Sequence, residues 1–193
     1  MHMLAFVDII RPKQKLKALC FDALVVMLGS LLLALSSQVV IPLGFTPVPI
    51  TLQTWAVLLL GACLGSKRGM LAAVLYLVQG ICGVPLFAQA SCGLAVLTGA
   101  TGGYLVGFCF AAFCVGWLLE QGLRFHFVKT LAAMSAGMVI IYAMGVLWLA
   151  HFIGVEQAIY LGVVPFLVVD AIKVVLAAIL VPTVWKFLRS SSM

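Results

Sequence analysis

The sequence predicts an all-α membrane protein with six transmembrane helices. Its 193 residues are 65% hydrophobic and only 8% charged, a composition typical of a polytopic membrane protein and far from that of a soluble domain. From Gly69 to Leu119 the chain holds no Asp, Glu, Lys or Arg, which leaves room for two uninterrupted spans. Small groups of basic residues then recur between the apolar stretches, as they do in the cytoplasmic loops of membrane proteins.

Six apolar stretches can be interpreted as spans, since a span needs roughly 20 apolar residues and sometimes about 17. They predict helices over residues 19–41, 50–64, 69–81, 103–119, 130–153 and 158–187. The second and third are short. An uncharged, glycine-rich connection over 82–102 is too long for a plain turn. We therefore expect a cytoplasmic N-terminal segment (1–18), one membrane domain (19–188) and a cytoplasmic tail (189–193).

The basic residues fix the orientation, because Lys and Arg are retained on the cytoplasmic side of a membrane. They lie at every second boundary: Arg11, Lys13, Lys15, Lys17, Lys67, Arg68, Arg124, Lys129, Lys186 and Arg189. The alternate connections, at 42–49, 82–102 and around Glu156, contain no Lys or Arg. Both termini are therefore expected in the cytoplasm. The basic residues form no stripe of the kind that binds nucleic acid, so the formal charge of +6 reflects membrane topology.

Several classes of function lack their motifs. The chain has no phosphate-binding loop, no His-Glu-x-x-His and no Gly-x-Ser-x-Gly, so we expect neither ATP hydrolysis nor another enzymatic activity. Six cysteines, at 20, 63, 82, 92, 109 and 114, show no metal-ligand spacing, and neither a metal nor a cofactor is expected. Cys82 and Cys92 share one outer connection, where an oxidising compartment would allow a disulfide.

Asp170 and Lys173 are the leading candidates for a functional site. They lie inside the apolar stretch 163–180, and ionisable groups at membrane depth usually face a bundle interior or a cavity. A spacing of three residues puts both side chains on one helix face, where their charges can neutralise each other. The pair therefore predicts a site for a polar ligand.

Uncharged polar and aromatic residues are expected on the same, outer side. Gln53 follows two prolines, Tyr76 and Gln79 approach the end of the third helix, Gln89 lies in the long connection, and residues 98–104 open the fourth helix. Free N–H groups at that helix start suit an anionic oxygen. The alternative for each residue is an interfacial aromatic, a cap or a helix–helix hydrogen bond. Together they describe a pocket for a small polar molecule.

A stripe of small residues follows the first helix at Ala23, Ser30, Ala34 and Ser37. The spacings of seven, four and three residues keep all four on one face. Small residues let another helix approach closely in a membrane. The stripe therefore either packs within the bundle or docks a partner membrane subunit.

Six ordered motifs resemble those of the BioY family, the biotin-specific substrate-binding (S) components of energy-coupling-factor (ECF) transporters. They are PVPITLQ (47–53), LGSKRG (64–69), GVPLFA (83–88), TGGYLVGF (101–108), GVLWL (145–149) and GVVPFLVVDAIK (162–173). The resemblance covers all six helices, roughly residues 20–188. Two positions depart from the family pattern: Ala100, where the family usually has proline, and Gln79, where it commonly has an apolar residue.

The resemblance implies a six-helix S-component fold that captures biotin from the outer face of the bacterial cytoplasmic membrane. Biotin is then a transported substrate. The ATP would be used by partners, which in the family are one transmembrane coupling protein and two ATP-binding-cassette ATPases. The resemblance also favours the second interpretation of the small-residue stripe on the first helix, as the surface that binds that coupling protein.

The chemistry of biotin suggests how it would lie. Its ureido group offers two N–H donors and one carbonyl acceptor, which match an acceptor-only Asp170 and a donor-only Lys173. Asp170 would repel the anionic valerate tail, so the tail is expected at the outer mouth, beside Gln89 and the backbone of Gly102 and Gly103. The expected aromatic walls are Tyr76, Phe87, Tyr104, Tyr142 and Trp148.

Three other functions stay open on the sequence. An S component for another small vitamin would share the same architecture. An intramembrane hydrolase would need His151 as a base with a serine in hydrogen-bond reach. A passive channel is disfavoured, because a neutralised pair and bulky aromatic side chains do not line an open aqueous path.

Overall fold

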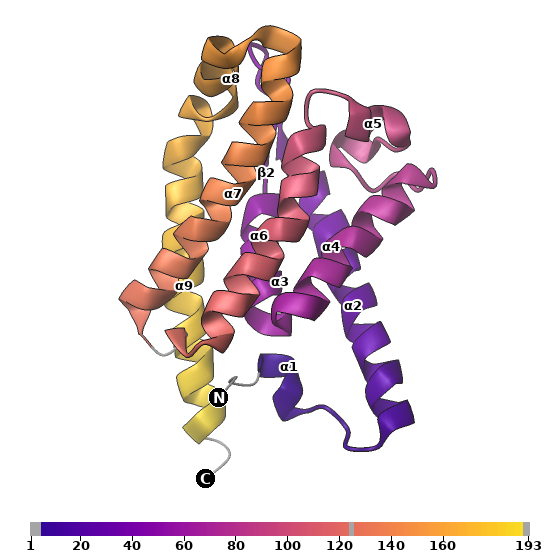
Figure 1. Ribbon diagram of the computed structural model, residues 1–193, viewed down its shortest axis with the longest axis vertical. Helices are drawn as coiled ribbons and strands as arrows, with labels where there is room; N and C mark the ends of the chain where they lie inside the picture. The colour runs from indigo at the N-terminus through magenta and orange to yellow at the C-terminus, as the bar shows by residue number, and fades with distance from the viewer. Residues whose placement is uncertain (1–4, 124–125, 191–193) are drawn as a thin grey trace.

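The computed structural model describes residues 5–123 and 126–190 of the chain, with the side chains of Ile9 and of residues 184–190 left aside. Arg124, residues 1–4 of the expected N-terminal segment and residues 191–193 of the expected tail lie outside the described residues. The helices are α1 (Phe6–Ile9), α2 (Lys15–Gln38), α3 (Gln53–Leu64), α4 (Ser66–Ile81), α5 (Leu94–Thr98), α6 (Gly102–Glu120), α7 (Phe127–Ile153), α8 (Val155–Gly162) and α9 (Leu167–Ser190). Figure 1 shows how they form one bundle.

The expected all-α membrane class is confirmed. Among the described residues, four helical stretches are long and apolar enough to cross a membrane: Lys15–Gln38, Gly102–Glu120, Phe127–Ile153 and Val155–Thr183. A fifth, Gln53–Leu64, is apolar but shorter. The first helix begins four residues before its expected start, because the Lys and Leu residues there are good helix formers.

The connections gather at two ends of the bundle (Figure 1). The loop end holds the turn 42–49, the connection 82–101 and α8. The terminal end holds the first and last described residues, the junction of α3 and α4 at Gly65, the end of α6 and the start of α7. The basic groups at residues 11–17 and 67–68 and Lys129 all fall on segments of the terminal end.

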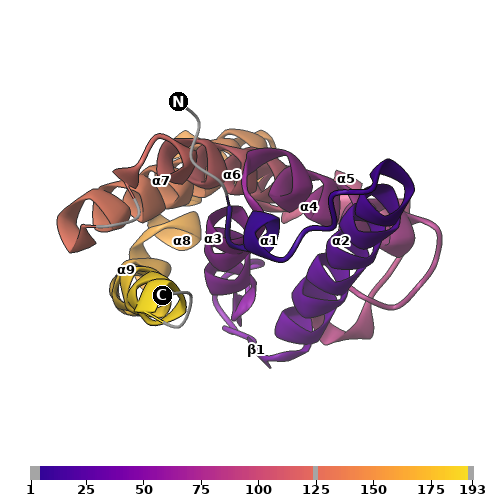
Figure 2. The same ribbon diagram turned by 90° about the horizontal axis from the view of Figure 1, so that it is seen from below.

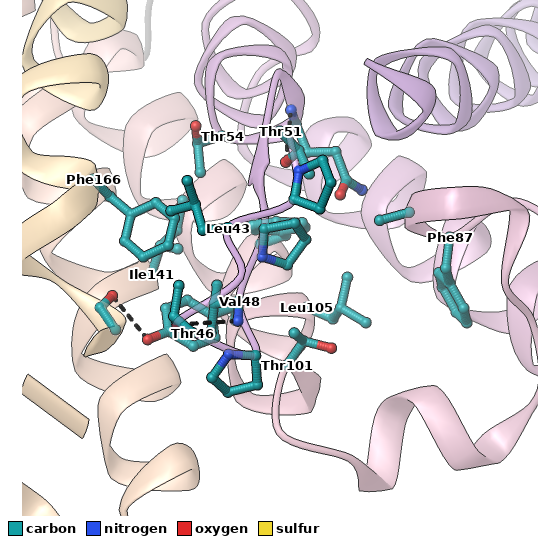
Figure 3. A pocket seen from close by; sticks show the side chains of 18 of the residues that line it. Leu43, Thr46, Val48, Thr51, Thr54, Phe87, Thr101, Leu105, Ile141 and Phe166 are labelled. Atoms are coloured by element: carbon teal, nitrogen blue, oxygen red, sulfur yellow. Dashed lines mark hydrogen bonds between the residues drawn. The ribbon is translucent and has the colours of Figure 1, made fainter. Parts of the chain in front are cut away.

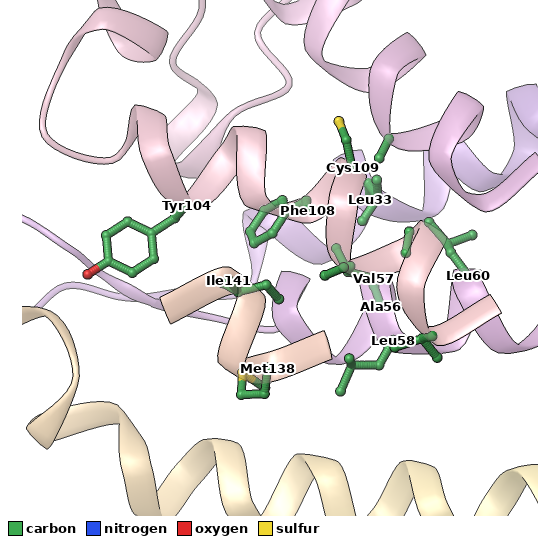
Figure 4. Close-up of a cluster of buried hydrophobic side chains, with 14 of the residues drawn as sticks. Leu33, Ala56, Val57, Leu58, Leu60, Tyr104, Phe108, Cys109, Met138 and Ile141 are labelled. Atoms are coloured by element: carbon green, nitrogen blue, oxygen red, sulfur yellow. The ribbon is translucent and has the colours of Figure 1, made fainter. Parts of the chain in front are cut away.

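Close helix contacts hold the centre of the bundle together. A Cβ atom on Gly61 would lie 2.5 Å from the carbonyl oxygen of Ala112, and one on Gly116 would lie 2.6 Å from Cα of Ser66. These glycines let α3, α4 and α6 approach to backbone contact, which is how helices associate where lipid removes the hydrophobic driving force. Around them lies an apolar core that includes Val57, Leu58 and Ile141 (Figure 4).

A pair of two-residue strands closes the turn 42–49. Strand β1 (Val40–Ile41) pairs antiparallel with β2 (Ile50–Thr51), so that Val40 faces Thr51 and Ile41 faces Ile50. Prolines at both ends of the turn cannot continue such a ladder. The ribbon therefore stays short and delivers the chain into α3.

The expected sixth helix, 158–187, is wrong in one respect: it is two helices. Helix α8 ends at Gly162, a 3₁₀ turn spans Val164–Phe166, and α9 begins at Leu167. Pro165 supplies no backbone N–H and disfavours helical torsions at Val164. The break leaves the carbonyl oxygens of Leu161 and Gly162 free to accept hydrogen bonds from the hydroxyls of Thr46 and Tyr104, both at 2.9 Å.

The long connection 82–101 is ordered along much of its length. It contains a 3₁₀ turn (Ala88–Ala90) and α5, and its residues Phe87 and Ser91 form an isolated β-bridge. Gln89 and Ala90 both have positive φ, at 58° and 53°, which is uncommon for residues other than glycine and is found often at functional sites. The cysteines of this connection, Cys82 and Cys92, are exposed and free in this structure.

Ion pairs fasten the N-terminal segment to the terminal end. Arg68 bonds Asp8 at 2.8 Å and Asp22 at 2.9 Å, and Arg11 reaches the other oxygen of Asp22 at 2.6 Å. These pairs connect α1, α2 and α4. In Figure 2, α1 lies against the end of α3.

Candidate binding cavity

A cavity of about 270 Å³ lies toward the loop end. Figure 3 shows side chains around it, with Phe166 and Phe87 on opposite sides. The walls come from the turn 42–49, the start of α3, residues 87–91, the first turns of α6, the middle of α7 and the start of α9. The lining residues are Pro42, Leu43, Thr46, Pro47, Val48, Pro49, Thr51, Gln53, Thr54, Phe87, Ala88, Gln89, Ser91, Val96, Thr101, Tyr104, Leu105, Phe108, Ile141, Tyr142, Gly162, Phe166, Asp170 and Lys173.

Asp170 and Lys173 meet at the buried end of this cavity. Their side chains form an ion pair, with Lys173 Nζ 2.7 Å from Asp170 Oδ1, and the two residues are only 4% and 8% exposed. Nζ also donates to the carbonyl oxygen of Thr51 at 2.7 Å and to Thr54 Oγ1 at 3.0 Å. An ammonium group has three N–H donors, so each has a partner. Burial is tolerated because both charges are paired and hydrogen-bonded.

Two hydroxyl groups hold the carboxylate of Asp170. Thr54 Oγ1 donates to Oδ1 at 3.0 Å, and the hydroxyl of Tyr142 donates to Oδ2 at 2.6 Å. A carboxylate oxygen can accept two hydrogen bonds. Since Tyr142 is the donor to Oδ2 among the described residues, a second acceptor position on Oδ2 remains for a ligand N–H.

Gln53 and Tyr76 form a second polar pair, of which only Gln53 lines the cavity. The amide of Gln53 donates to the hydroxyl of Tyr76 at 2.8 Å, and that hydroxyl donates to the carbonyl oxygen of Leu86 at 3.3 Å. Tyr76 is fully buried, and its ring packs edge-on against Phe87, with centroids 5.4 Å apart. Tyr76, expected as a wall, therefore supports two lining residues from behind.

Helix α6 turns only one face to the cavity. Thr101, Tyr104, Leu105 and Phe108 line it, and their spacing of three, four and seven residues from Thr101 follows one side of a helix. Gly102 and Gly103 lie between these positions, with Gly102 against α5 and Gly103 against α7. A Cβ atom on Gly102 would collide with the carbonyl oxygen of Leu97, and one on Gly103 would collide with Cβ of Trp148.

Gly102, Gly103 and Trp148 are therefore outside the cavity lining, contrary to the sequence-based expectation. The N–H of Gly102 already donates to the carbonyl oxygen of Gly99 at 3.1 Å. Trp148 is 41% exposed, and its indole N–H donates to that same oxygen at 2.8 Å. Gly102 packs against Leu97 of α5, Gly103 and Trp148 pack α6 on α7, and the helix phase keeps all three out of the cavity lining.

The small-residue stripe packs inside the bundle. Ser30, Ala34 and Ser37 are buried, and only Ala23 is exposed. Ser30 donates to Gln79 Oε1 at 2.6 Å, and Ser37 donates to the carbonyl oxygen of Leu86. The structure thus agrees with packing of α2 on α4, the first of the two interpretations, and three of the four residues are inaccessible to a partner in this conformation.

Some lining residues were missed from the sequence. Thr51 and Thr54 bind the ion pair, while Ile141 and Phe166 complete the walls. A signal existed for Thr54, because it follows Gln53 directly and lies three residues after Thr51. His151 contributes nothing to this site: it is exposed, and its contact among the described residues is the carbonyl oxygen of Leu147 at 3.4 Å. That position offers no support for an intramembrane hydrolase.

The bundle has the fold of a membrane S component. It superposes with a TM-score of 0.80 on the crystal structure of the S component for biotin from an ECF-type ABC transporter, covering 91% of this chain and 95% of that one at 22% sequence identity. The model of the BioY family matches residues 12–190. The chain belongs to the BioY family.

Curated relatives agree with this assignment. The chain is 42% identical to the biotin transporter BioY of Thermotoga maritima, over 87% of this chain and 93% of the relative. It is 40% identical to the probable biotin transporter BioY of Pyrococcus horikoshii, over 80% and 92%, and 36% identical to BioY of Rhizobium etli, over 81% and 88%. It is thus a multi-pass membrane transporter and not an enzyme.

Proposed function

We propose that this chain captures biotin in the cavity at the loop end, as the substrate-binding component of an ECF transporter. The observation that carries the proposal is the buried ion pair of Asp170 and Lys173 on the cavity wall. The cavity of about 270 Å³ is close to the lower end of the range of about 300–1,000 Å³ found for ligand pockets. That size suits a small bicyclic molecule held in a largely apolar space.

The ureido head would bind at the buried end. Oδ2 of Asp170 can accept one ureido N–H beside its bond from Tyr142. Because the three donors of Lys173 already have partners, the ureido carbonyl must replace one of them. Thr54 is the partner that can yield, since a hydroxyl rotates freely and a backbone carbonyl does not.

The remaining lining residues would enclose the rest of the ligand. Phe87, Tyr104 and Phe108 provide apolar surface for the thiophane ring, and Gln53 offers an amide. The valerate tail would extend toward Gln89, which is exposed at the loop end. Of the residues expected from the sequence, seven carry this proposal: Asp170, Lys173, Gln53, Phe87, Gln89, Tyr104 and Tyr142.

The proposed topology has six spans and both termini in the cytoplasm. The spans are α2, α3, α4, α6, α7 and the broken pair α8–α9, and their outermost ends at Lys15 and Ser190 extend slightly beyond the expected membrane domain 19–188. Support comes from the basic groups, which lie on segments of the terminal end, because Lys and Arg favour the cytoplasmic side of a membrane. The loop end with its cavity would then face outward, where biotin is captured.

The proposed partners are a transmembrane coupling protein and two ATP-binding-cassette ATPases. The solved structure with the same fold is an S component from an ECF-type ABC transporter, which supports this assignment. The chain has no phosphate-binding loop of its own, so the energy of ATP would have to come from other subunits. The terminal end, which faces the cytoplasm in this topology, is the side on which the ATPases would act.

Equilibrium binding of labelled biotin to the detergent-purified protein tests the proposal. We expect saturable binding that excess biotin abolishes and that riboflavin and thiamine leave unchanged. Lys173→Ala should weaken binding at least about tenfold, and Lys129→Ala, at an exposed lysine of the terminal end, should not. Thermal melting shows whether each variant is folded. Competition by another vitamin would favour the alternative S component, and no binding by folded wild-type protein would refute the biotin assignment.

A further inference from the structure

The charge of the cavity is confined to its buried end. Among the described residues that line it, Asp170 and Lys173 are the charged ones. The opposite part is lined by neutral groups, which include the amide of Gln89 and the hydroxyls of Ser91 and Thr101. Figure 3 shows Thr101 at the far side of the cavity from Thr51 and Thr54, which bind the ion pair.

Lys173 is poorly placed to bind the carboxylate of a ligand. Its ammonium group lies 2.7 Å from Asp170 and has three hydrogen-bond acceptors already. A second carboxylate there would lie beside Asp170, and two like charges in a low-dielectric site repel each other strongly. The tail of an acidic ligand is therefore directed to the neutral part of the cavity.

The neutral part is open to the surface. Pro42, Pro47 and Gln89 line the cavity and are exposed at the loop end. The two connections that surround this opening, 42–49 and 82–101, contain no Lys or Arg in the sequence. Amide and hydroxyl donors can hydrogen-bond the oxygen of an ester or an amide as well as that of an acid.

From this distribution we infer that the cavity recognises the ureido head and accepts biotin derivatives whose carboxyl group is replaced by a neutral amide or ester. The inference rests on the proposed function, because it assumes that biotin is the ligand. Biotinyl amides, including biotin joined to an amino acid, thereby become a second class of substrate. Their added groups would extend through the opening beside Gln89.

Binding of biotin, biotinamide and biotin methyl ester to the detergent-purified protein tests this inference. An ion pair or charge-assisted hydrogen bond to the tail would make the acid bind about tenfold to a hundredfold more tightly than its neutral forms. We expect all three affinities to agree within about tenfold. A larger loss for both neutral ligands, with biotin still bound, would overturn the inference and leave the proposed function standing. Failure of biotin itself to bind would overturn both.

A cation introduced at the opening gives a second test. Gln89→Lys should make the protein prefer biotin over biotinamide by several-fold, because the new ammonium group would lie near the acidic tail. Phe45→Lys is the matched control, since Phe45 is exposed in the turn 42–49 at the same loop end and does not line the cavity. Equal preference in both variants would contradict the placement of the tail at the opening.

Discussion

The hydroxyl of Thr54 on α3 donates a hydrogen bond of 3.0 Å to the carboxylate of Asp170 on α9, 116 residues away in sequence. The same oxygen accepts a hydrogen bond from Lys173 at 3.0 Å. Thr54 therefore joins both members of the ion pair to a different helix. Its position fixes where the pair points in the cavity.

Thr54→Val should weaken biotin binding, because it removes the hydroxyl and keeps the shape of the side chain. A hydrogen bond to a charged group contributes about 1.5–3 kcal/mol, so we expect a loss of about tenfold to a hundredfold in affinity. Thr54→Ser, which retains the hydroxyl, should bind nearly as wild type does. Isothermal titration of both variants measures this. Equal losses in the two variants would indicate that the methyl group, and not the hydroxyl, matters.

Asp170→Asn should destabilise the protein, because it leaves the charge of Lys173 buried without its partner. Breaking a buried ion pair by removing one member costs about 3–5 kcal/mol. The double variant Asp170→Asn with Lys173→Met should recover most of the lost stability and still fail to bind biotin. Thermal melting and ligand binding, measured on the same samples, separate the two effects. A double variant that binds as wild type does would exclude the pair from recognition.

Gln79→Leu should loosen the packing of α2 on α4. The change removes the acceptor of the hydrogen bond from Ser30, which measures 2.6 Å. Hydrogen bonds between membrane helices contribute about 0.6–2 kcal/mol. A double-mutant cycle with Ser30→Ala should give a coupling energy of that size in the free energy of unfolding. A coupling near zero would mean that the two side chains do not interact in the membrane.

Arg68→Met should free the N-terminal segment from the terminal end. Arg68 holds Asp8 and Asp22 together, and its loss leaves two carboxylates facing each other. We expect faster proteolysis between residues 5 and 14 and unchanged biotin affinity. Lys67→Met, at the neighbouring exposed residue, is the control. Proteolysis at the wild-type rate would show that the apolar contacts of Ala5 and Val7, both buried, are sufficient to hold the segment.

The sequence predicted the fold class and the chemical centre of the site for one physical reason. Charges are so costly in lipid that their positions mark both the ends of the spans and the buried pair that lines the cavity. Asp170 and Lys173 could therefore be found without a structure. Five further residues that line the cavity were also expected at the site, because their side chains are polar or aromatic and were expected near the outer side. They are Gln53, Phe87, Gln89, Tyr104 and Tyr142.

The remaining cavity residues could not be predicted, because which side of a helix faces the cavity depends on the rotation of that helix. The sequence of a uniformly apolar span does not reveal this rotation. Residues 102 and 103 differ from 101 and 104 mainly in rotation about the axis of α6, and that rotation is set by packing of Gly102 on Leu97 and of Gly103 on Trp148. The stripe on α2 is similar, since small residues suit an internal neighbour and an external partner equally well. The burial of Ser30, Ala34 and Ser37 and the contact of Ser30 with Gln79 distinguish the two.

The break at Pro165 has an electrostatic consequence for the ligand. Since α9 starts again at Leu167, Asp170 lies in its first turn. Aligned peptide dipoles give a helix start a partial positive charge of about +0.5. A continuous helix through this region would place Asp170 far from any such charge. The carboxylate would therefore keep a favourable electrostatic environment when a ligand bound as proposed draws Lys173 into new hydrogen bonds.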